Sequence, residues 1–400
     1  MRTTRREYEL KISIVGGGGR VGLPLGIVLA DAGHSVSIID LDKNRVNSIN
    51  SRIMPFFESG AAELLNKLAL DQLSASIDNS KIEGTDVCIL IVGTPVLEDG
   101  TPSANSLIQL VSNLIPHLIN VKMLMLRSTV YPGITHQLKK LLKDSGLDIT
   151  VSFCPERIAE GNAIKELKML PQIVGAEDKM SIELSSKIFS NIGSRVIITS
   201  IKEAELIKLF ANSYRYIQFG IANEFFQICK SNDINWENVW NGLTSDYPRA
   251  ANLPKPGFAA GPCLVKDTHQ LNYYYNNNFE LGKSALQVNE NLPDFIVSQL
   301  EKNFDLKNLT IGILGMTFKG NVDDFRDSLS FNLLEIIQKV AKEVICSDAL
   351  LQKEYFVSEN QILEDSDVII IATPHDQYRA IITEKPIIDI WRITQNVSLF

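Results

Sequence analysis

The chain has few cysteines, and those it has are scattered. Its 400 residues include five cysteines and no CxxC pair. An odd, dispersed set indicates reduced thiols rather than a disulfide framework, which predicts a cytoplasmic protein. None of the cysteines forms a zinc-like cluster with the five histidines, so we predict no metal site.

Other absences argue against membranes and nucleic acid. No apolar run approaches the roughly 20 residues that a membrane span needs, and the charged segment 1–9 lacks the apolar core of a signal peptide. The formal net charge is −8 without a long basic run, so nucleic acid is not expected as a partner. With 400 residues, 45% of them hydrophobic, the chain is typical of a globular protein of two or three domains.

A dinucleotide-binding pattern opens the chain. A short β-branched strand over 11–15 leads into Gly17, Gly19 and Gly22 in GxGxxG spacing, and a helix follows. Asp40 ends the next strand, 18 positions after Gly22. The glycines allow close approach of a pyrophosphate at a helix N-terminus. Asp40 can accept from both ribose hydroxyls and would repel a 2′-phosphate, which favours NAD over NADP. A structural glycine-rich turn is the alternative.

Strands and helices then alternate up to about residue 200. This alternation predicts the α/β class, with an N-terminal Rossmann-like, doubly wound parallel sheet over residues 10 to 200. The expected strands are Lys11–Val15, Ser35–Ile39, Val87–Val92, Met123–Leu126 and Thr150–Phe153, and the expected helices are Leu23–Ala32, Ser103–Leu118 and Gly133–Lys143.

The rest of the chain is first helical and then α/β again. One unbroken helix is expected over Ile201–Lys230, long enough to link domains or to form an oligomer interface. Further helices are expected at Trp236–Leu243, Ser284–Lys302 and Ser328–Val340, and strands at Leu309–Leu314, Glu343–Ser347, Val368–Ala372 and Pro386–Ile390. We therefore predict three domains: an NAD-binding domain over 1–200, a central long-helix domain over 201–306, and a smaller C-terminal α/β domain over 307–400.

A cysteine lies in a loop of small residues that begins at Gly257. Lys266 and Asp267 follow Cys263 by three and four positions. A neighbouring cation favours thiolate over thiol, and an aspartate within reach can orient water or move a proton. The loop therefore suggests an enzyme that oxidises with a nicotinamide and holds its product on sulfur. The alternative is a buried, inert cysteine followed by a solvated Lys-Asp pair.

Seven short motifs, in order, resemble those of the UDP-glucose/GDP-mannose dehydrogenase family of nucleotide-sugar 6-dehydrogenases. They are Gly17–Pro24, Val92–Pro95 with Asp99-Gly100, Ser128–Gly133, Pro155–Gly161, Lys208–Tyr214, Cys263 with Asp267, and Gly315–Lys319 with Asp323–Ser328. The chain departs from the family at Ala260-Gly261-Pro262, where members usually carry Gly-Gly and then an aromatic residue or His before the cysteine. We expect the extra methyl group and the rigid proline to change how the sugar sits.

The resemblance implies a four-electron oxidation of a sugar C6 alcohol to a carboxylate with two NAD⁺. Cys263 would be the nucleophile, Asp267 and Thr129 would position water or relay protons, and Lys208 would stabilise oxyanion charge. Asn212 would hold the sugar or the oxyanion, and Glu160 would lie near the nicotinamide. The alternatives are a solvated helix face for Lys208 and Asn212, a turn hydroxyl for Thr129, and a helix cap for Glu156 and Glu160.

The resemblance also implies binding residues. The NAD cofactor would be held by Gly17, Gly19, Arg20, Val21, Gly22, Asp40, Arg45, Thr94, Thr129 and Arg326. The substrate would be held by Glu156, Arg157, Glu160, Lys208, Asn212, Arg249 and Lys319. Arg249 would reach the substrate of a neighbouring subunit, because the family forms homodimers, here through the central helix; as an isolated surface arginine it would be unremarkable.

The form of the segment Pro155–Gly161 is more similar to members that act on UDP-N-acetylhexosamines, such as UDP-N-acetylmannosamine. UDP-glucose remains an alternative substrate. Two further readings stay open: a hydroxyacid dehydrogenase that makes one NADH without Cys263, and a non-catalytic sensor of nucleotide-sugars or NAD.

Overall fold

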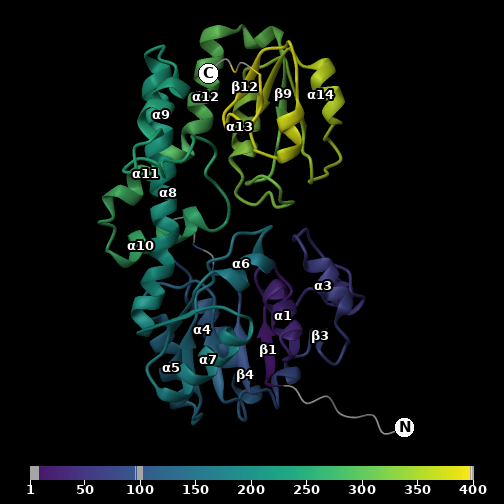
Figure 1. Cartoon of the computed structure of the whole chain (residues 1–400), viewed down its shortest axis with the longest axis vertical. Helices are drawn as coiled ribbons and strands as arrows, with labels where there is room; N and C mark the ends of the chain where they lie inside the picture. The colour runs from purple at the N-terminus through teal and green to yellow at the C-terminus, as the bar shows by residue number, and fades with distance from the viewer. Residues whose placement is uncertain (1–8, 95, 97–101, 397, 399–400) are drawn as a thin grey trace. The chain divides into compact units, whose positions relative to one another are not determined.

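The structure is a computed structural model that describes residues 9–94, 96, 102–396 and 398. It contains two compact units, Met1–Phe210 and Ala211–Phe400 (Figure 1). Pro95, Asp99 and Gly100 of the second motif lie outside the described residues. Within the described part of the chain, no helix is long and apolar enough to cross a membrane.

The first unit is built on an eight-stranded sheet with the order β3-β2-β1-β4-β5-β6-β7-β8. The first six strands in this order are parallel, and β1 pairs in register with both β2 and β4. The strands are β1 (Lys11–Val15), β2 (Ser35–Ile39), β3 (Leu73–Ser76), β4 (Val87–Leu90), β5 (Met123–Leu126), β6 (Thr150–Phe153), β7 (Gln172–Gly175) and β8 (Val196–Thr199). The predicted doubly wound sheet is confirmed.

The last two strands differ from the fully parallel sheet that the sequence predicts. Strands β7 and β8 are parallel to each other, but β7 meets β6 in antiparallel orientation through the single pair Phe153↔Gly175. The chain leaves β6 and enters β7 after one loop and one short helix, α6 (Ala163–Met169). Strand β7 therefore starts at the edge of the sheet where β6 ends and runs back along its neighbour.

Helices cover both faces of this sheet. Alternate residues of β1 face opposite ways, so Ile12 and Ile14 join the core under α1, whereas Val15 joins the second core under α4 and α5. The helices are α1 (Gly22–Asp31), α2 (Lys43–Asn50), α3 (Ala61–Lys67), α4 (Asn105–Leu114), α5 (Ile134–Asp144) and α7 (Lys179–Asn191). The helix predicted over 103–118 is shorter and ends in a 3₁₀ turn at Pro116, which cannot donate a backbone hydrogen bond.

The second unit begins with helices. Helix α8 (Ile201–Ser231) is unbroken, as predicted, and the boundary between the units falls within it. The others are α9 (Trp236–Thr244), α10 (Leu264–Tyr274), α11 (Glu280–Glu290) and α12 (Leu292–Asn303). The single helix predicted over 284–302 is wrong: the chain breaks at Asn291, before Pro293, which occupies the first turn of α12.

A four-stranded parallel sheet with the order β10-β9-β11-β12 completes the second unit. Its strands are β9 (Thr310–Leu314), β10 (Glu343–Ser347), β11 (Val368–Ile371) and β12 (Ile387–Asp389). Helix α13 (Leu329–Ile337) packs with α12 on one side, and α14 (Glu359–Asp365) lies on the other (Figure 1). The smaller C-terminal α/β region is confirmed.

Candidate active site

The glycine-rich turn after β1 fits a dinucleotide. A β-carbon on Gly17 would lie 2.7 Å from the Ile14 carbonyl oxygen, and one on Gly22 would lie 2.5 Å from the Gly17 Cα. These two positions therefore need glycine for the turn and helix to pack closely. A β-carbon on Gly19 would meet nothing within 4 Å, so this glycine leaves open space beside the backbone. Such space lets a pyrophosphate approach the N-terminus of α1.

Asp40 lies at the end of β2, as predicted, and it is tied to the same turn. Its Oδ2 accepts from the Gly18 N–H at 2.8 Å, and its Oδ1 accepts from the Asp42 N–H at 3.0 Å. The sequence reasoning missed Asp42, which caps α2 by accepting from two backbone N–H groups. Arg45 lies on α2 with its Nε 3.3 Å from Asp42 Oδ2. An aspartate directly before a helix is the signal that could have found this cap.

Arg20 and Glu160 approach each other within the first unit. Arg20 belongs to the glycine-rich turn, beside Val21 at the N-cap position of α1, and Glu160 belongs to the loop after β6. The Arg20 Nε lies 3.9 Å from Glu160 Oε2, and the guanidinium lies 5.0 Å from the centre of the Phe56 ring. The fold thus brings a predicted cofactor residue and a predicted catalytic residue to the same edge of the sheet.

Glu156 is a buried anchor of its loop. Its Oε2 is paired with Arg127 at the end of β5, and its Oε1 accepts from the N–H groups of Arg157 and Ile158 at 2.7 and 3.0 Å. Arg127 is 2% exposed; the sequence places it after a strand at the ligand-binding end of the sheet but does not assign it a role in the site. Arg157 donates to the Pro171 carbonyl oxygen. Burial lowers the pKa of Arg157, and the Glu156 charge opposes this shift.

The helix that follows this loop is capped from a distant segment. Glu58 accepts from the Gly161 N–H at 2.9 Å and from the Ala163 N–H at 2.8 Å, at the start of α6. The alternative that Glu156 caps this helix is wrong, because its two oxygens are held by Arg127 and by the N–H groups of Arg157 and Ile158. Glu58 lies about a hundred positions earlier in the chain, and no local pattern marks it as a cap.

Thr94 and Thr129 come together at the carboxyl ends of β4 and β5. The Thr94 hydroxyl donates to the Thr129 carbonyl oxygen at 2.6 Å, and the Val92 N–H donates to the Ser128 hydroxyl at 2.8 Å. The two loops are thus held to each other by their own polar groups. Carboxyl ends of neighbouring parallel strands are where such sheets bind ligands.

Lys208 and Asn212 lie one turn apart on α8. They are 9% and 8% exposed, so the alternative of a solvated helix face is wrong. Within the second unit, Asn212 Nδ2 donates to Asp267 Oδ2 at 2.6 Å, and Lys266 Nζ donates to Asp267 Oδ1 at 2.7 Å. The buried Asp267 carboxylate is thus held by an amide and an ammonium group. The Lys266 and Asp267 side chains are 19% and 1% exposed, so the alternative of a solvated Lys-Asp pair is also wrong.

Cys263 is exposed, whereas the other four cysteines are buried. It occupies the N-cap position of α10, a helix that the sequence reasoning did not predict, and its carbonyl oxygen accepts from the Asp267 N–H at 2.9 Å. The inert, buried cysteine of the alternative reading is therefore excluded. The helix dipole at this end favours negative charge on the sulfur.

The cysteine loop is fixed by close backbone contacts within the second unit. Gly261 has φ +98°, and a β-carbon on it would lie 2.3 Å from the Phe318 ring. Its N–H donates to the Asp327 carbonyl oxygen at 3.1 Å. At the start of the loop, Asn223 of α8 exchanges two hydrogen bonds with the backbone of Gly257 at 2.8 and 3.0 Å. The loop therefore joins α8 to the loops of the C-terminal sheet.

Three predicted binding residues lie elsewhere on the second unit. Arg249 is exposed, and its Nε donates to the Tyr247 hydroxyl at 2.7 Å. Arg326 donates to Asp324 through Nε at 3.0 Å. Lys319 lies in the loop after β9. The predicted site residues thus divide between the units, with Thr129, Glu160 and Lys208 in the first and Asn212, Cys263 and Asp267 in the second.

Comparison with known proteins identifies one family along the chain. The UDP-glucose/GDP-mannose dehydrogenase family matches through its NAD binding domain over residues 10–193, its central domain over 202–291 and its UDP binding domain over 312–396. An NAD-binding domain and a UDP-binding domain identify NAD as the cofactor and a UDP-sugar as the substrate.

Individual relatives agree with this match. The chain is 31% identical to a UDP-N-acetyl-D-mannosamine dehydrogenase of Methanocaldococcus jannaschii, over 90% of this chain and 85% of the relative. It is 27% identical to a UDP-glucose 6-dehydrogenase of Rickettsia bellii, over 92% and 90%.

Among solved structures, a UDP-D-ManNAc dehydrogenase from Pyrococcus horikoshii superposes with a TM-score of 0.89 at 26% identity, over 98% of this chain and 97% of that chain. The chain therefore belongs to the UDP-glucose/GDP-mannose dehydrogenase family and is an NAD-binding nucleotide-sugar 6-dehydrogenase.

Proposed function

We propose that this enzyme oxidises the C6 hydroxyl of UDP-N-acetylmannosamine, or of a closely similar UDP-N-acetylhexosamine, to the carboxylate in two successive steps. The observation that carries the proposal is the exposed thiol of Cys263 at the start of α10, one turn before the buried carboxylate of Asp267. A product held on sulfur cannot escape between the two oxidations.

Cys263 forms and releases the covalent intermediate. Its thiolate adds to the C6 carbonyl carbon of the aldehyde, and the carbonyl oxygen takes up a proton, which gives a thiohemiacetal. Loss of a hydride from this carbon and of a proton from its hydroxyl oxygen leaves a thioester. Water then adds to the thioester, the carbon–sulfur bond breaks, and the thiolate returns with the carboxylate product. Bound NAD⁺ supplies the hydride acceptor in both oxidations.

Asp267 acts as the base or orienting group for water, and its environment supports this role. The Asn212 amide and the Lys266 ammonium hold both of its oxygens, which fixes the carboxylate in one orientation. Asn212 in turn holds the sugar or the oxyanion. Lys208 stabilises the developing oxyanion, and Thr129 and Glu160 orient water and the nicotinamide.

Most of the proposed cofactor residues belong to the first unit, and the sugar-binding residues come from both units. Gly17, Gly19 and Gly22 hold the pyrophosphate, and Asp40 holds the adenosine ribose. The same proposal includes further contacts to both ligands. The additional NAD contacts are Arg20, Val21, Arg45, Thr94, Thr129 and Arg326. The sugar contacts are Arg157, Arg249 and Lys319. Glu156, buried against Arg127, supports the sugar-binding loop rather than contacting the sugar.

The choice of sugar is supported by the relatives. The UDP-N-acetyl-D-mannosamine dehydrogenase named above is 31% identical to this chain, and the UDP-glucose 6-dehydrogenase is 27% identical to it. The match to the mannosamine enzyme agrees with the form of the segment Pro155–Gly161. UDP-glucose is the second candidate.

A homodimer is supported by an apolar stripe on α8, which we call the α8 stripe. Its members are Phe210, Tyr214, Ile221, Phe225 and Ile228, with exposed fractions between 41% and 62%. Their spacing of three, four or seven positions puts them on one helical face. A second copy of the chain would cover this face.

We further propose the three domains 1–200, 201–306 and 307–400, and a cytoplasmic location.

The test is to count NADH formed per sugar consumed over a panel of UDP-sugars. We expect two NADH per UDP-N-acetylmannosamine for the wild type. Cys263→Ala should lose turnover by at least about a thousandfold, because no thiohemiacetal can form. One NADH per sugar that is insensitive to Cys263→Ala would indicate a simple alcohol or hydroxyacid dehydrogenase. Ligand binding without NADH would indicate a sensor.

A further inference from the structure

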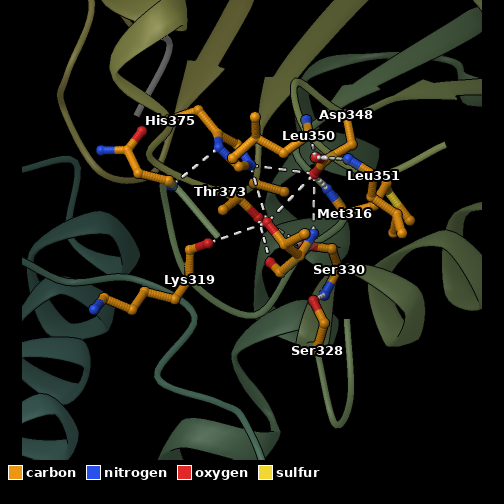
Figure 2. A network of polar contacts seen from close by, with 12 residues as sticks. Met316, Lys319, Ser328, Ser330, Asp348, Leu350, Leu351, Thr373 and His375 are labelled. Atoms are coloured by element: carbon orange, nitrogen blue, oxygen red, sulfur yellow. Dashed lines mark hydrogen bonds and ion pairs between the residues drawn. The ribbon is translucent and has the colours of Figure 1, made fainter. Parts of the chain in front are cut away.

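A buried histidine connects two loops of the C-terminal sheet (Figure 2). His375 is 1% exposed and follows β11. Its Nε2 lies 2.9 Å from the Thr317 hydroxyl oxygen and 3.2 Å from Asp348 Oδ2. Its Nδ1 accepts from the Asn321 N–H at 3.1 Å. Thr317 and Asn321 belong to the loop after β9, and none of the roles proposed above uses this histidine.

The contacts of His375 determine its tautomer. The Asn321 N–H can only donate, so Nδ1 must accept, and in a neutral imidazole the proton then lies on Nε2. The Nε2–H is donated to the Thr317 hydroxyl, its nearest acceptor. The Thr317 hydroxyl can then donate its own proton to the Lys319 carbonyl oxygen, which lies at 3.1 Å. A single neutral imidazole therefore supports a chain of hydrogen bonds that ends on the backbone of Lys319.

Asp348 completes the network as an ionised acceptor. Its Oδ2 accepts from the N–H groups of Met316 and Thr317 at 2.6 and 3.0 Å. Burial alone would raise the pKa of this carboxyl, but the hydrogen bond from His375 and those from the N–H groups of Leu350 and Leu351 lower it. The beginning of the loop after β9 is thus fixed to the end of β10.

Lys319 is held on both sides by these contacts. On one side lies Thr317, and on the other lies Asn321, which adopts φ 60° and exchanges two side-chain hydrogen bonds with Asp376 at 2.7 and 3.0 Å. A β-carbon on Gly320 would lie 2.1 Å from the Pro374 carbonyl oxygen, so the two loops touch backbone to backbone. The Lys319 side chain itself extends away from the network (Figure 2).

The two loops lie where this sheet is expected to bind a ligand. In the order β10-β9-β11-β12, the chain moves one way from β9 to β10 and the other way from β11 to β12. The carboxyl ends of β9 and β11 are therefore the topological switch point, where open α/β sheets form their ligand crevice. His375 joins the two loops that border this point.

We propose that His375 is a positioning residue for the nucleotide part of the substrate: its neutral imidazole locks the loop Gly315–Asn321 onto the loop after β11 and so orients Lys319 toward the UDP group. The proposal rests on the proposed function, in which Lys319 binds the nucleotide-sugar. His375 does not touch the reacting C6 carbon and acts only through the loop. Its loss should therefore weaken UDP binding without slowing the chemistry at saturating substrate.

Three variants of His375 test the contributions of its two ring nitrogens separately. His375→Ala removes both contacts. His375→Asn keeps an acceptor near the Nδ1 position, for the Asn321 N–H, and His375→Gln keeps a donor near the Nε2 position, for Thr317. A matched control is His117→Ala, which removes an exposed histidine paired with Glu83 in the first unit.

The readouts are UDP binding by calorimetry, and kcat and KM for the sugar and for NAD⁺. We expect His375→Ala to raise the Kd for UDP and the KM for the sugar roughly tenfold, because loop hydrogen bonds are lost. The kcat and the KM for NAD⁺ should stay within about twofold, and each amide variant should recover part of the UDP affinity. His117→Ala should match the wild type.

Several outcomes would overturn the inference. Unchanged UDP binding in all three variants would show that the loop does not need the imidazole. A fall in kcat without a change in UDP binding would also contradict it. If His375→Ala does not fold, the Asn and Gln variants decide in the same way. A wild type that binds no UDP would overturn both the inference and the proposed function, whereas wild-type binding with unaffected variants overturns the inference alone.

Discussion

At the scale of single residues, Cys263 differs from every other cysteine in its access to water. Cys88, Cys154, Cys229 and Cys346 are buried. Burial raises the pKa of Cys88 to about 12 and that of Cys154 and of Cys346 to about 11. Since the thiolate is the reactive form, these thiols stay protonated and unreactive near neutral pH.

We therefore predict that iodoacetamide labels Cys263 alone in the folded protein at pH 8. The raised pKa values mean that the buried thiols lose their protons only well above this pH, so a rise to pH 9 should add little further label. Mass spectrometry of peptides measures the label at each site, and protein unfolded in urea should carry five labels. A second cysteine that reacts as fast as Cys263 in the folded protein would contradict the assignment.

The pair Lys266–Asp267 is a second feature of single residues with a measurable consequence. The Lys266 side chain is 19% exposed and that of Asp267 is 1% exposed. Lys266→Met keeps the apolar stem but removes the ammonium group that donates to this buried carboxylate, so we expect a loss of about 3 kcal/mol in the free energy of unfolding. Urea denaturation followed by circular dichroism measures this loss.

The control for this prediction is Lys283→Met. Lys283 pairs with Glu280 at the same distance of 2.7 Å, but both side chains are well exposed. Loss of such a surface pair should cost less than about 1 kcal/mol. Equal losses in the two variants would mean that burial does not strengthen the pair at Asp267.

At the scale of elements, the cysteine loop depends on glycine where it meets the C-terminal sheet. Gly261→Ala would force a β-carbon to within 2.3 Å of the Phe318 ring, at a residue with φ +98°. We expect a loss of about 1–3 kcal/mol in the free energy of unfolding. We also expect a lower kcat, because Cys263 lies two residues further on. Denaturation and steady-state kinetics measure the two effects.

Gly242→Ala is the matched control. Gly242 lies in α9, and a β-carbon there would meet nothing within 4 Å. The same substitution in a helix should raise the free energy of unfolding by about 0.5–1 kcal/mol and leave kcat unchanged. If Gly261→Ala behaved like this control, the contact with Phe318 would not constrain the loop.

Helix α10 shows the limit of local patterns at this scale. The sequence reasoning treated 257–267 as a loop, but a helix begins directly after Cys263. The glycines and the proline before the cysteine indicate a loop, and no Ser, Asp or Asn stands at the N-cap to signal a helix start. Helix α8, by contrast, was predicted almost to its ends, because its periodic pattern continues for 31 residues.

At the scale of the whole molecule, the α8 stripe predicts the assembly. Phe225→Glu would put a charge in the middle of the proposed homodimer interface, where it would lose water without gaining a partner. We expect the mass in solution to fall from twice 44.5 kDa to 44.5 kDa, measured by light scattering. Turnover should fall with it, since Arg249 would no longer reach the neighbouring subunit.

Ile119→Glu provides the comparison for this variant. Ile119 is 67% exposed on the first unit and lies outside the α8 stripe. We expect it to keep the mass and the turnover of the wild type. A Phe225→Glu protein that stays at twice the mass of one chain would rule out the stripe as the interface.

The sequence by itself determined the α/β class and the cofactor class, and it singled out Cys263 as the proposed nucleophile. These rest on short-range information. The glycine spacing closes one turn, hydrophobic periodicity reports the faces of one strand or helix, and Cys263 stands four residues from Asp267. Each such signal is complete within a few residues, so it can be read without knowledge of the fold.

Only the tertiary structure decided which side chains meet. Glu58 caps α6, Arg127 holds Glu156, Asn212 holds Asp267, and His375 holds Asn321, in each case across 29 to 105 positions of the chain. A buried polar group must find a partner, but the sequence does not state which loop will supply it. The strand order decides which loop supplies the partner, because this order brings distant loops to the same edge of a sheet.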